Sequence, residues 1–415
     1  MLSPWLMGLL GVAVTGVVAA VLGAVLLAGF LRTPPAAVLA AGFVVADVAS
    51  GRVTFALGLV VALAAVRWRS GSLAVLTALV SPVAAAFLGL VGVVLVVHRR
   101  PRGLRLAVGA LVPTALLAWL FGDGGVQPFP FRSAALTVLV LLAVLALTED
   151  ELVRTTATLL VLLTVVLALT SDPFGSNVQR LPLLLAAPVL LATSRWRLLP
   201  VALAGCLVWQ LAPLQGDLST SRLPMAAVTA ELRTLGSVRA EVVAPRDHAD
   251  VTTGLLLARG WARQVDVARN PLFYSGTLTG ASYLAWLREN AVDHVALPRH
   301  GALDIGATRE ATLLAQPVEG LSRVWEDDDW TVWRVEGAEP VVPGVVSATR
   351  AALVVGDWPT ASSGEAVGQR VVRITWSPWL TLEGKGCIAP SGRWVSLRAT
   401  GRVTITSSLL PHGHC

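Results

Sequence analysis

The stretch WLMGLLGVAVTGVVAAVLGAVLLAGFL, from Trp5 to Leu31, holds 27 residues without a charged side chain or a histidine. A helix needs roughly 20 apolar residues to cross the hydrocarbon layer of a membrane, so the stretch predicts one spanning helix. It differs from a cleaved signal peptide because no basic segment precedes it and its apolar run is too long. The sequence therefore predicts an integral membrane protein.

Further apolar segments follow along the first half of the chain. They are Ala36–Ala49, Val53–Val66, Leu73–Val97, Leu106–Phe121, Ala134–Leu147, Thr155–Leu169, Leu181–Ala192 and Leu198–Leu211. Together with the first stretch they predict a polytopic α-helical domain with about nine transmembrane segments.

The composition excludes a single soluble enzyme. Hydrophobic residues make up 55% of the 415 residues, charged residues 14%, and the mean hydropathy is +0.70. Residues 1–213 hold 13 basic and 6 acidic side chains, whereas residues 214–415 hold 19 and 20. We therefore expect a membrane domain at 1–213 and a nearly neutral soluble part after it. The excess positive charge lies in short loops between apolar runs, so we exclude nucleic acid as a partner.

Basic loop residues predict the orientation, because short loops rich in Lys and Arg stay in the cytoplasm. One cluster surrounds Arg99 and Arg100, and the other is Arg195 with Arg197. Four predicted spans separate the clusters, so both can be cytoplasmic, and one more span then carries residues 214–415 outside. We expect a multi-pass protein of the plasma membrane whose C-terminal half is extracytoplasmic.

Two features leave the orientation of the first helices open. If Arg32 is cytoplasmic, Met1 lies outside, so either the first helix inserts in reverse or the chain begins inside a longer membrane protein. Pro82 divides Leu73–Val97 after Ser81, so this segment is either one kinked span or a hairpin of two half-helices. The orientation of everything before it depends on which.

The exported half changes to short alternating elements. Residues 214–340 predict an α/β domain with helices at Met225–Leu235 and Ala281–Asn290 and strands at Val238–Val243 and His294–Pro298. The segment Arg323–Val335 predicts a hairpin whose turn is Asp327 to Asp329. Residues 341–415 predict a small β-sandwich. Its strands are expected at Ala351–Val355, Arg370–Trp376, Trp394–Ala399 and Arg402–Ser407.

The chain contains three cysteines. Cys206 lies in the last apolar segment and is most simply a small buried hydrophobic residue. Cys387 and Cys415 both fall in the exported part, where an oxidising environment allows a disulfide. We predict that they pair, with two free thiols as the alternative.

The sequence offers two weak candidates for a metal site. Asp327, Asp328 and Asp329 could supply oxygen ligands, but three adjacent carboxylates on one turn do not converge, which favours a solvated turn. The tail His412, His414 and Cys415 has metal-ligand residue types, but structural zinc sites draw on two separated pairs. We therefore predict no metal site in either place.

Polar side chains at the outer membrane face are the stronger candidates, because ionisable residues near a bilayer are costly and often functional. Asp47 lies in an apolar run just before Arg52. Asp123 lies in the loop FGDGGVQPFPF, and Asn177 and Arg180 lie in SDPFGSNVQRL, which also holds Asp172. Together they predict a polar vestibule in which Arg180 pairs with a phosphate. In the alternative, Arg180 reaches to the interface and Asn177 caps the following helix.

Several stretches resemble a group of actinobacterial multi-pass membrane proteins. They are SGRVTFALGL (Ser50–Leu59), SPVAAAFLGL (Ser81–Leu90), PFGSNVQRLPLLLAAP (Pro173–Pro188), LARGWARQVDVARNPLFY (Leu257–Tyr274) and YLAWLRENAVDHVALP (Tyr283–Pro298). That group is similar in architecture to GT-C glycosyltransferases and YfhO-type membrane proteins. The single lysine, Lys385, among many arginines also suits such a source.

The resemblance implies a glycosyltransferase that takes sugar from a polyprenyl-phosphate carrier and acts on the cell envelope. In the GT-C class, an acidic residue in the first outer loop serves as base or metal ligand, which leaves a divalent cation open as a cofactor. Here the first helix is followed only by Arg32, Thr33 and Pro34. The resemblance therefore implies an N-terminally truncated member, active or inactive, in which Asp47 replaces that acid.

The resemblance and the residues lead to two hypotheses. The first is a GT-C-like glycosyltransferase, with Asp47 as catalytic residue and Arg52, Asp123, Asn177 and Arg180 as substrate-binding residues. The alternative is a non-catalytic membrane scaffold or transport-related protein whose exported domain binds a partner. In both, the lipid bilayer surrounds the helices, and the sequence does not determine an oligomeric state.

Overall fold

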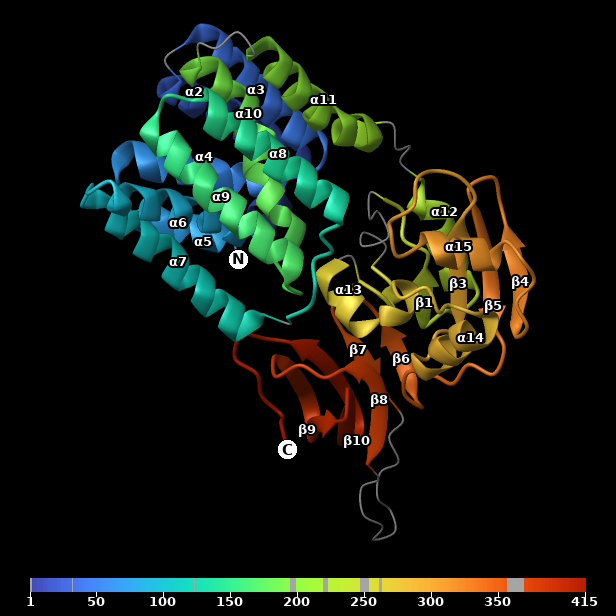
Figure 1. Ribbon diagram of the computed structural model, residues 1–415. Helices are drawn as coiled ribbons and strands as arrows, with labels where there is room; N and C mark the ends of the chain where they lie inside the picture. Colours follow the sequence, from blue (N-terminus) through green and yellow to red (C-terminus); the bar gives the residue numbers. More distant parts are fainter. Residues whose placement is uncertain are drawn as a thin grey trace. The chain divides into compact units, whose positions relative to one another are not determined.

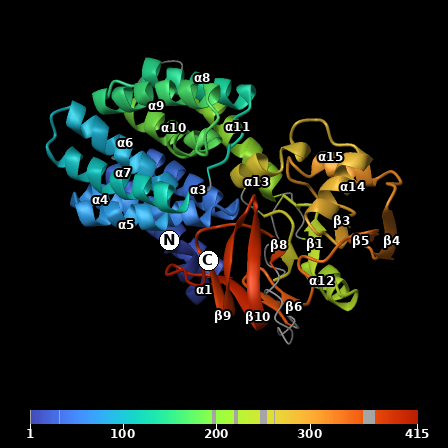
Figure 2. The same ribbon diagram turned by 90° about the horizontal axis from the view of Figure 1, so that it is seen from below.

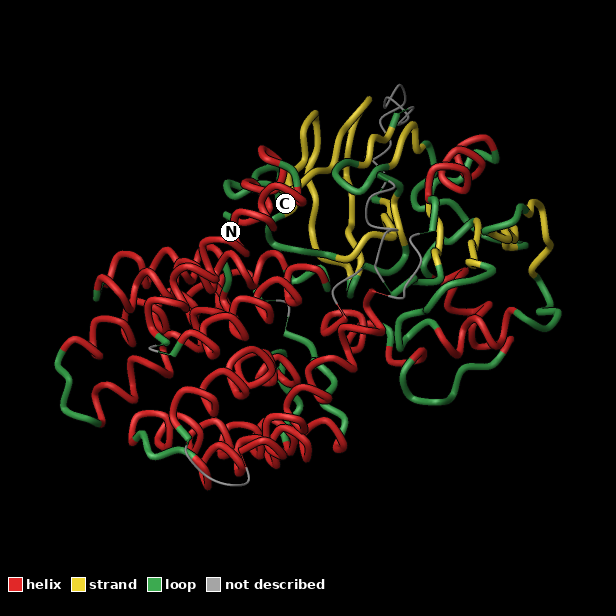
Figure 3. The backbone as a smooth tube through the Cα atoms, turned by 90° about the horizontal axis from the view of Figure 1, so that it is seen from above, coloured by secondary structure: helices red, strands yellow, loops and turns green. Residues whose placement is uncertain are grey.

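The computed structural model describes residues 2–31, 33–122, 124–194, 199–218, 223–246, 254–260, 263–356 and 369–415. It divides into two compact units, Met1–Ser219 and Thr220–Cys415, named below the helical unit and the mixed unit. Figure 3 shows helices and loops in the first unit and strands with helices in the second. The predictions made for Asp123, Arg32, Arg195 and Arg197 lie outside the described residues.

The helices of the helical unit follow the predicted apolar segments (Figure 1). They are α1 (Ser3–Leu10), α2 (Val12–Phe30), α3 (Pro34–Ala49), α4 (Val53–Trp68), α5 (Gly71–Val80), α6 (Pro82–Val97), α7 (Arg102–Phe121), α8 (Phe131–Leu147), α9 (Glu151–Leu169), η1 (Gly175–Gln179), α10 (Arg180–Thr193) and α11 (Leu199–Leu218).

Several of these helices are apolar enough to identify a membrane protein. Within the described residues, four of them, α2, α7, α9 and α11, have both the length and the composition needed to cross a membrane. Others, such as α3 and α4, have 16 residues each and are apolar but shorter. The predicted number of about nine spans is therefore not confirmed.

The first apolar stretch is not one helix, which corrects the prediction for Trp5–Leu31. Gly11 separates α1 from α2 with φ 81° and ψ 152°. A glycine adopts this conformation without the steric cost that a Cβ atom would bring. Hydropathy alone does not reveal such a break, because glycine leaves an apolar run uninterrupted.

The segment Leu73–Val97 is a hairpin of two helices, α5 and α6, that turns back at Ser81. Ser81 is extended, with φ −150° and ψ 106°, because the proline at position 82 disfavours a helical conformation before it. Both helices pack on α7. A Cβ atom on Gly109 of α7 would lie 3.0 Å from Ala74 of α5, and one on Gly92 of α6 would lie 2.9 Å from the Cβ atom of Ala107.

The order of these contacts gives the direction of each helix. The neighbours of α7 on α6 come in reverse order. Gly103 lies beside Leu95, Ala107 beside Gly92, and Leu111 beside Gly89, so α6 runs antiparallel to α7. On the other side of α7, Arg105 lies beside Gly71 of α5. Gly109, one turn later, lies beside Gly71 and Ala74, so α5 runs parallel to α7. The hairpin thus returns to the end of the unit from which it started (Figure 2).

Basic loops gather at this end of the helical unit, named below the arginine-rich end. Gly71, just after Arg67 and Arg69, lies beside Arg105. His98 Nε2 lies 2.8 Å from Thr155 Oγ1 near the start of α9, and Thr148 Oγ1 lies 2.8 Å from Thr193 Oγ1. The loop before α7, the loop before α9 and the end of α10 therefore lie at one end of the unit.

The mixed unit contains an α/β part and a β-rich part. Its helices are α12 (Met225–Thr234), α13 (Arg263–Arg269), η3 (Pro271–Phe273), α14 (Gly280–Glu289) and α15 (Thr308–Leu314). Its strands are β1 (Arg239–Val242), β2 (Leu256–Leu257), β3 (His294–Pro298), β4 (Leu321–Glu326), β5 (Trp330–Val335), β6 (Val345–Ala348), β7 (Leu353–Val355), β8 (Arg370–Thr375), β9 (Leu380–Ser391) and β10 (Trp394–Ser407).

The first sheet confirms the predicted α/β elements. Its order is β2-β1-β3-β5-β4, in which β1 pairs in parallel with β2 and β3 while β5 pairs antiparallel with β3 and β4. The hairpin of β4 and β5 is closed by Asp327 to Asp329, as predicted. Strand residues of this sheet belong to two hydrophobic clusters. One contains the fully buried Tyr283 and the other the fully buried Trp330.

The β-rich part differs from the predicted sandwich. Its described strands form one antiparallel sheet of order β6-β7-β10-β8, with β9 also pairing with β10. The two predicted strands Trp394–Ala399 and Arg402–Ser407 are one long strand, β10, and β9 was not predicted. The sheet folds over itself where its ladder shifts between Thr400 and Thr404, so both halves of β10 contribute to one core.

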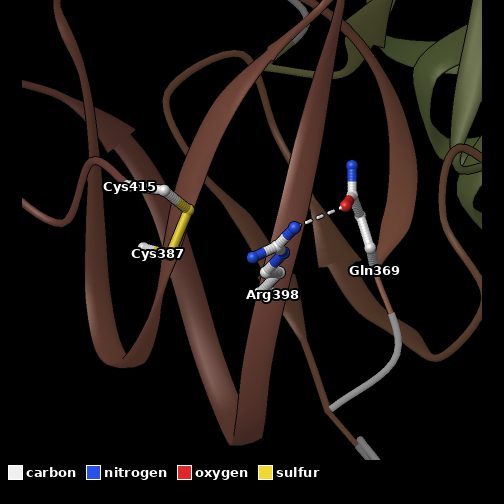
Figure 4. Close-up of a disulfide and its surroundings, with 4 residues drawn as sticks. All are labelled: Gln369, Cys387, Arg398 and Cys415. Carbon is white, nitrogen blue, oxygen red and sulfur yellow. Dashed lines mark hydrogen bonds between the residues drawn. A yellow bond between two sulfur atoms is a disulfide. The ribbon is translucent and has the colours of Figure 1, made fainter. Parts of the chain in front are cut away.

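The C-terminus is joined to β9 by the Cys387–Cys415 disulfide (Figure 4). The tail also adds backbone hydrogen bonds, because Ile388 N donates to Gly413 O at 2.8 Å and Cys415 N donates to Ile388 O at 2.9 Å. On β10, Arg398 Nη2 donates to Gln369 Oε1 at 2.9 Å. The sequence analysis expected this pair of cysteines, and Cys206 is buried as a free thiol.

Candidate functional site

An ionic cluster lies where α3 ends and α4 begins, at the end of the helical unit opposite the arginine-rich end. Asp47 is buried near the end of α3, and its Oδ1 lies 3.5 Å from Arg52 Nη1. Arg52 Nη2 also lies 3.6 Å from Asp217 Oδ2, near the end of α11. Three helices thus bring two carboxylates to one guanidinium. We name this end of the unit the Asp47 end.

Arg180 joins this cluster from the first residue of α10. Its guanidinium carbon lies 5.4 Å from the ring centroid of Phe55, one turn after Arg52, and it interacts electrostatically with both Asp47 and Arg52. Within the described residues it forms no ion pair, and Asp47 Oδ2 is buried without a hydrogen-bond partner. The cluster therefore has one cation and one carboxylate oxygen able to accept further partners.

Apolar grooves begin beside Arg180 and follow α10. One, of about 90 Å³, lies between α4, α6 and α10 and is lined by residues such as Phe55, Phe87 and Leu181. Another, of about 170 Å³, lies between α8, α9 and α10 and also includes Leu181 and Leu185. Both are lined almost wholly by hydrocarbon, so the arrangement pairs a charged head region with space for apolar chains.

The two polar loops singled out from the sequence meet in the structure. Gln127 N donates to Asp172 O at 2.8 Å, and Gln127 Nε2 donates to Ser176 Oγ at 3.1 Å. Asp172 shapes its own loop, because its Oδ1 accepts from the backbone N–H groups of Phe174 and Gly175 at 2.8 and 2.7 Å. The loops expected to share one side of the membrane therefore lie together.

Asn177 has a local role. Its Nδ2 donates to Phe174 O at 2.9 Å, and its own carbonyl accepts from Arg180 N. Its side chain does not cap α10, which begins at Arg180 without a side-chain cap. Of the predicted site residues, the structure thus brings together Asp47, Arg52 and Arg180, while Asn177 stabilises the turn that positions Arg180.

Sequence reasoning missed Asp217 and Phe55. Asp217 follows the last apolar segment, so its place on the predicted outer side was a usable signal. Phe55 gave no signal, because an aromatic residue in an apolar helix is indistinguishable from its neighbours. Only the packing of α4 against α10 places its ring under the guanidinium of Arg180.

The two weak metal candidates have other partners in the structure. Asp327 Oδ1 accepts from Asp329 N and Trp330 N at 2.9 and 2.7 Å, and Asp329 pairs with His300. In the tail, His414 bonds to Leu380 O, and Cys415 is in the disulfide. Over the described part of the chain, no group of three His, Cys, Asp or Glu residues could hold a metal ion. We therefore derive no step through a divalent cation.

A second polar cluster, in the mixed unit, surrounds Arg259 just after β2. Its Nε donates to Glu241 Oε1 of β1 at 2.7 Å, its Nη2 pairs with Glu310 of α15, and its Nη1 lies 3.6 Å from Asp266 of α13. The guanidinium also lies 3.7 Å from the ring centroid of Phe273. Sequence reasoning missed this cluster, since its members are widely separated in the chain.

Burial controls the electrostatics of this second cluster. It raises the pKa of Glu241 well above the ordinary value of 4.5, against the lowering effect of Arg259, and nearby Glu310 raises it further. Burial also raises the pKa of Glu310. Glu241 Oε2 has no hydrogen-bond partner among the described residues. The cluster joins β1 to α13 and α15, and we read it as structural.

This burial predicts that the mixed unit loses stability as the pH rises. The folded pKa of Glu241 is above its unfolded value, so the protonated form contributes stability that is complete below about pH 4.5 and is lost as the pH rises through the folded pKa. We expect Glu241→Gln, which stays neutral, to flatten this fall. Thermal unfolding of both proteins between pH 4.5 and 9 measures it, and equal slopes would contradict the prediction.

Comparison with known proteins adds no relative to this geometry. The chain matches no protein-family model, and no curated protein or solved structure is similar to it.

Proposed function

We propose that this integral membrane protein binds the phosphate of a polyprenyl-linked sugar at the Asp47 end and transfers the sugar to a cell-envelope acceptor, as GT-C glycosyltransferases do. One observation carries the proposal. Arg52, just before α4, contacts the buried Asp47, and Arg180 of α10 interacts electrostatically with both, next to an apolar groove that begins at Leu181. An amphiphile with an anionic head matches this combination of charge and hydrocarbon.

The proposal assigns each group a part in binding. Arg180 has no ion pair among the described residues, so its fork of donors is available to a phosphate. Arg52 already contacts Asp47 and Asp217 at 3.5 and 3.6 Å, distances long enough to permit a change of partner. The isoprenyl chain would follow the groove past Phe87 and Leu181.

We further propose that the Asp47 end faces the outside of the plasma membrane. The arginine-rich end then lies in the cytoplasm, where short basic loops are retained. In this arrangement α5 and α6 form a re-entrant hairpin rather than a crossing. Because Asp217 near the end of α11 pairs with Arg52, α11 also ends on the outer side, which carries the mixed unit outside.

The proposed reaction is a sugar transfer. The bond between the anomeric carbon and the phosphate oxygen breaks, and polyprenyl phosphate leaves with the electron pair, held by Arg180. The acceptor hydroxyl oxygen forms the new bond to the anomeric carbon. Its proton passes to Asp47 Oδ2, the carboxylate oxygen that has no hydrogen-bond partner among the described residues.

Binding of polyprenyl phosphate to the protein in nanodiscs tests the head-group site. Loss of a charge-assisted hydrogen bond costs about 1.5–3 kcal/mol, so Arg180→Gln is expected to weaken binding by about 10-fold to 150-fold. Arg132→Gln is the matched control, because Arg132 is exposed at the start of α8, at the same end of the unit. Equal affinities for the two variants would refute the phosphate site.

One observation favours the alternative of a membrane scaffold or transport-related protein. The cluster has two carboxylates and two guanidinium groups, so its charges balance without a ligand. A balanced cluster of this kind is sufficient to join helices. Alanine at Asp47 or Arg180 distinguishes the two. A scaffold keeps its partner and its fold with either variant, whereas a transferase keeps its fold and loses turnover.

A further inference from the structure

An apolar tip projects from the end of the β-rich part. Leu409 and Leu410, just after β10, are 74% and 84% exposed. The run from Val403 to Pro411 contains no charged residue. Two adjacent leucines at a loop tip are unusual on a surface that faces only water, because most of their apolar area stays exposed.

Tryptophans lie beside this tip. Ser408 N donates to Trp379 O at 2.9 Å, which places Trp379 next to Leu409. Trp376 N donates to Arg393 O at 2.9 Å, and its ring lies 5.3 Å from that of His414. Trp376, Trp379 and Trp394 are all half-buried. We name this region, from Leu409 and Leu410 to the three tryptophans, the Leu409 edge.

A basic side chain completes the edge. The guanidinium carbon of Arg393 lies 4.1 Å from the ring centroid of Trp394. Arg393 Nη2 also pairs with Glu289 Oε1 of α14 at 2.8 Å. Exposed aliphatic residues, tryptophans and a basic side chain are the residue types that a membrane interface favours.

The chain attaches the mixed unit to a helix that can cross a membrane. Only residues 219–222 connect α11, a helix long and apolar enough to cross a membrane, with Leu223 of the mixed unit. An extended chain spans at most about 3.5 Å per residue, so this connection is shorter than about 20 Å. The bilayer that would surround α11 is therefore a surface within reach of the mixed unit.

We infer that the Leu409 edge inserts into the membrane interface, with Leu409 and Leu410 among the upper acyl chains and the tryptophans at the head groups. The partner is the lipid bilayer. A glycan is the other occupant that tryptophans can accept, but the two aliphatic side chains at the tip offer it no hydrogen bond. This inference does not depend on the proposed sugar transfer.

Spin labelling of the full chain in nanodiscs of phosphatidylcholine and phosphatidylglycerol tests the inference. A nitroxide on Leu410→Cys is compared with one on Gln316→Cys, an exposed position just after α15. The native cysteines do not compete, since Cys206 is buried and the other two form the disulfide. We expect the label at 410 to lie about 5–10 Å below the head groups and the label at 316 in water.

A second variant separates insertion from folding. A label on Ser407→Cys is measured with and without Leu409→Ser and Leu410→Ser, which alter exposed side chains only. We expect the serines to move this label into water. The inference is overturned if the label at 410 is as accessible to water as that at 316, or if the serines leave the depth at 407 unchanged. A label at 410 that stays in water and is immobilised by an added oligosaccharide would instead identify a glycan surface.

Discussion

Replacing Asp47 by asparagine is expected to slow sugar transfer by about 10²-fold to 10⁴-fold, the usual contribution of a general base. Asparagine keeps the shape of the side chain but cannot take the proton from the hydroxyl group of the sugar acceptor. Arg52 and Arg180 remain in place, so the affinity for polyprenyl phosphate should not fall. Turnover of a polyprenyl-phosphate sugar in proteoliposomes, measured beside binding, checks both statements.

The matched control is Asp217→Asn, because Asp217 contacts the same guanidinium as Asp47. It removes a carboxylate from the cluster but leaves the unpartnered Oδ2 of Asp47 unchanged, so we expect only a small change in rate. If Asp217→Asn is the slow variant and Asp47→Asn is not, the base has been assigned to the wrong residue. If neither variant affects turnover, the cluster joins helices and is not catalytic.

Replacing Arg259 by methionine is expected to destabilise the mixed unit by about 3–5 kcal/mol, the cost of leaving buried charges without their partner. Glu241, Glu310 and Asp266 all lose their shared cation, and none can turn toward water, because each is buried. Methionine fills much of the volume, so the loss reports on charge more than on packing. Thermal unfolding followed by tryptophan fluorescence measures it.

Arg309→Met is the control for this variant. Arg309 is exposed and precedes Glu310 on the same helix, so its loss should change stability by less than about 0.5 kcal/mol. The effect of Arg259→Met should also diminish as the pH falls, because burial raises the pKa values of Glu241 and Glu310 and so favours their neutral forms. A loss that is the same at pH 5 and pH 8 would mean that lost packing, and not charge, causes it.

Much of the fold could be predicted from the pattern of apolar residues. Uninterrupted apolar runs predicted helices such as α3, α8 and α9, and alternation with turn residues predicted β3 and the hairpin of β4 and β5. The errors lie at glycines. Gly11 divides the first run, while Gly384 and Gly386 fall within β9, a strand that the sequence analysis missed because glycine signals a turn more often than a strand.

The candidate site was predictable only in part. Asp47, Arg52 and Arg180 stood out because charges are rare among the apolar segments, and a rare charge is visible in a sequence. Whether they meet depends on the packing of α3, α4 and α10, which no local pattern encodes. Asp217 joins them only because α11 ends beside α4.

The sequence by itself determined that this is a membrane protein with an α/β and β-rich second half, since hydropathy and periodicity act over neighbouring residues. The tertiary structure alone decided that Ser81 turns a hairpin, that Arg180 lies over Phe55 and interacts electrostatically with Asp47, and that Arg259 is buried among three carboxylates. The physical reason is that burial and ion pairing are properties of residues distant in the chain. The energy of a buried charge depends on the groups packed around it, and those groups come from distant parts of the chain.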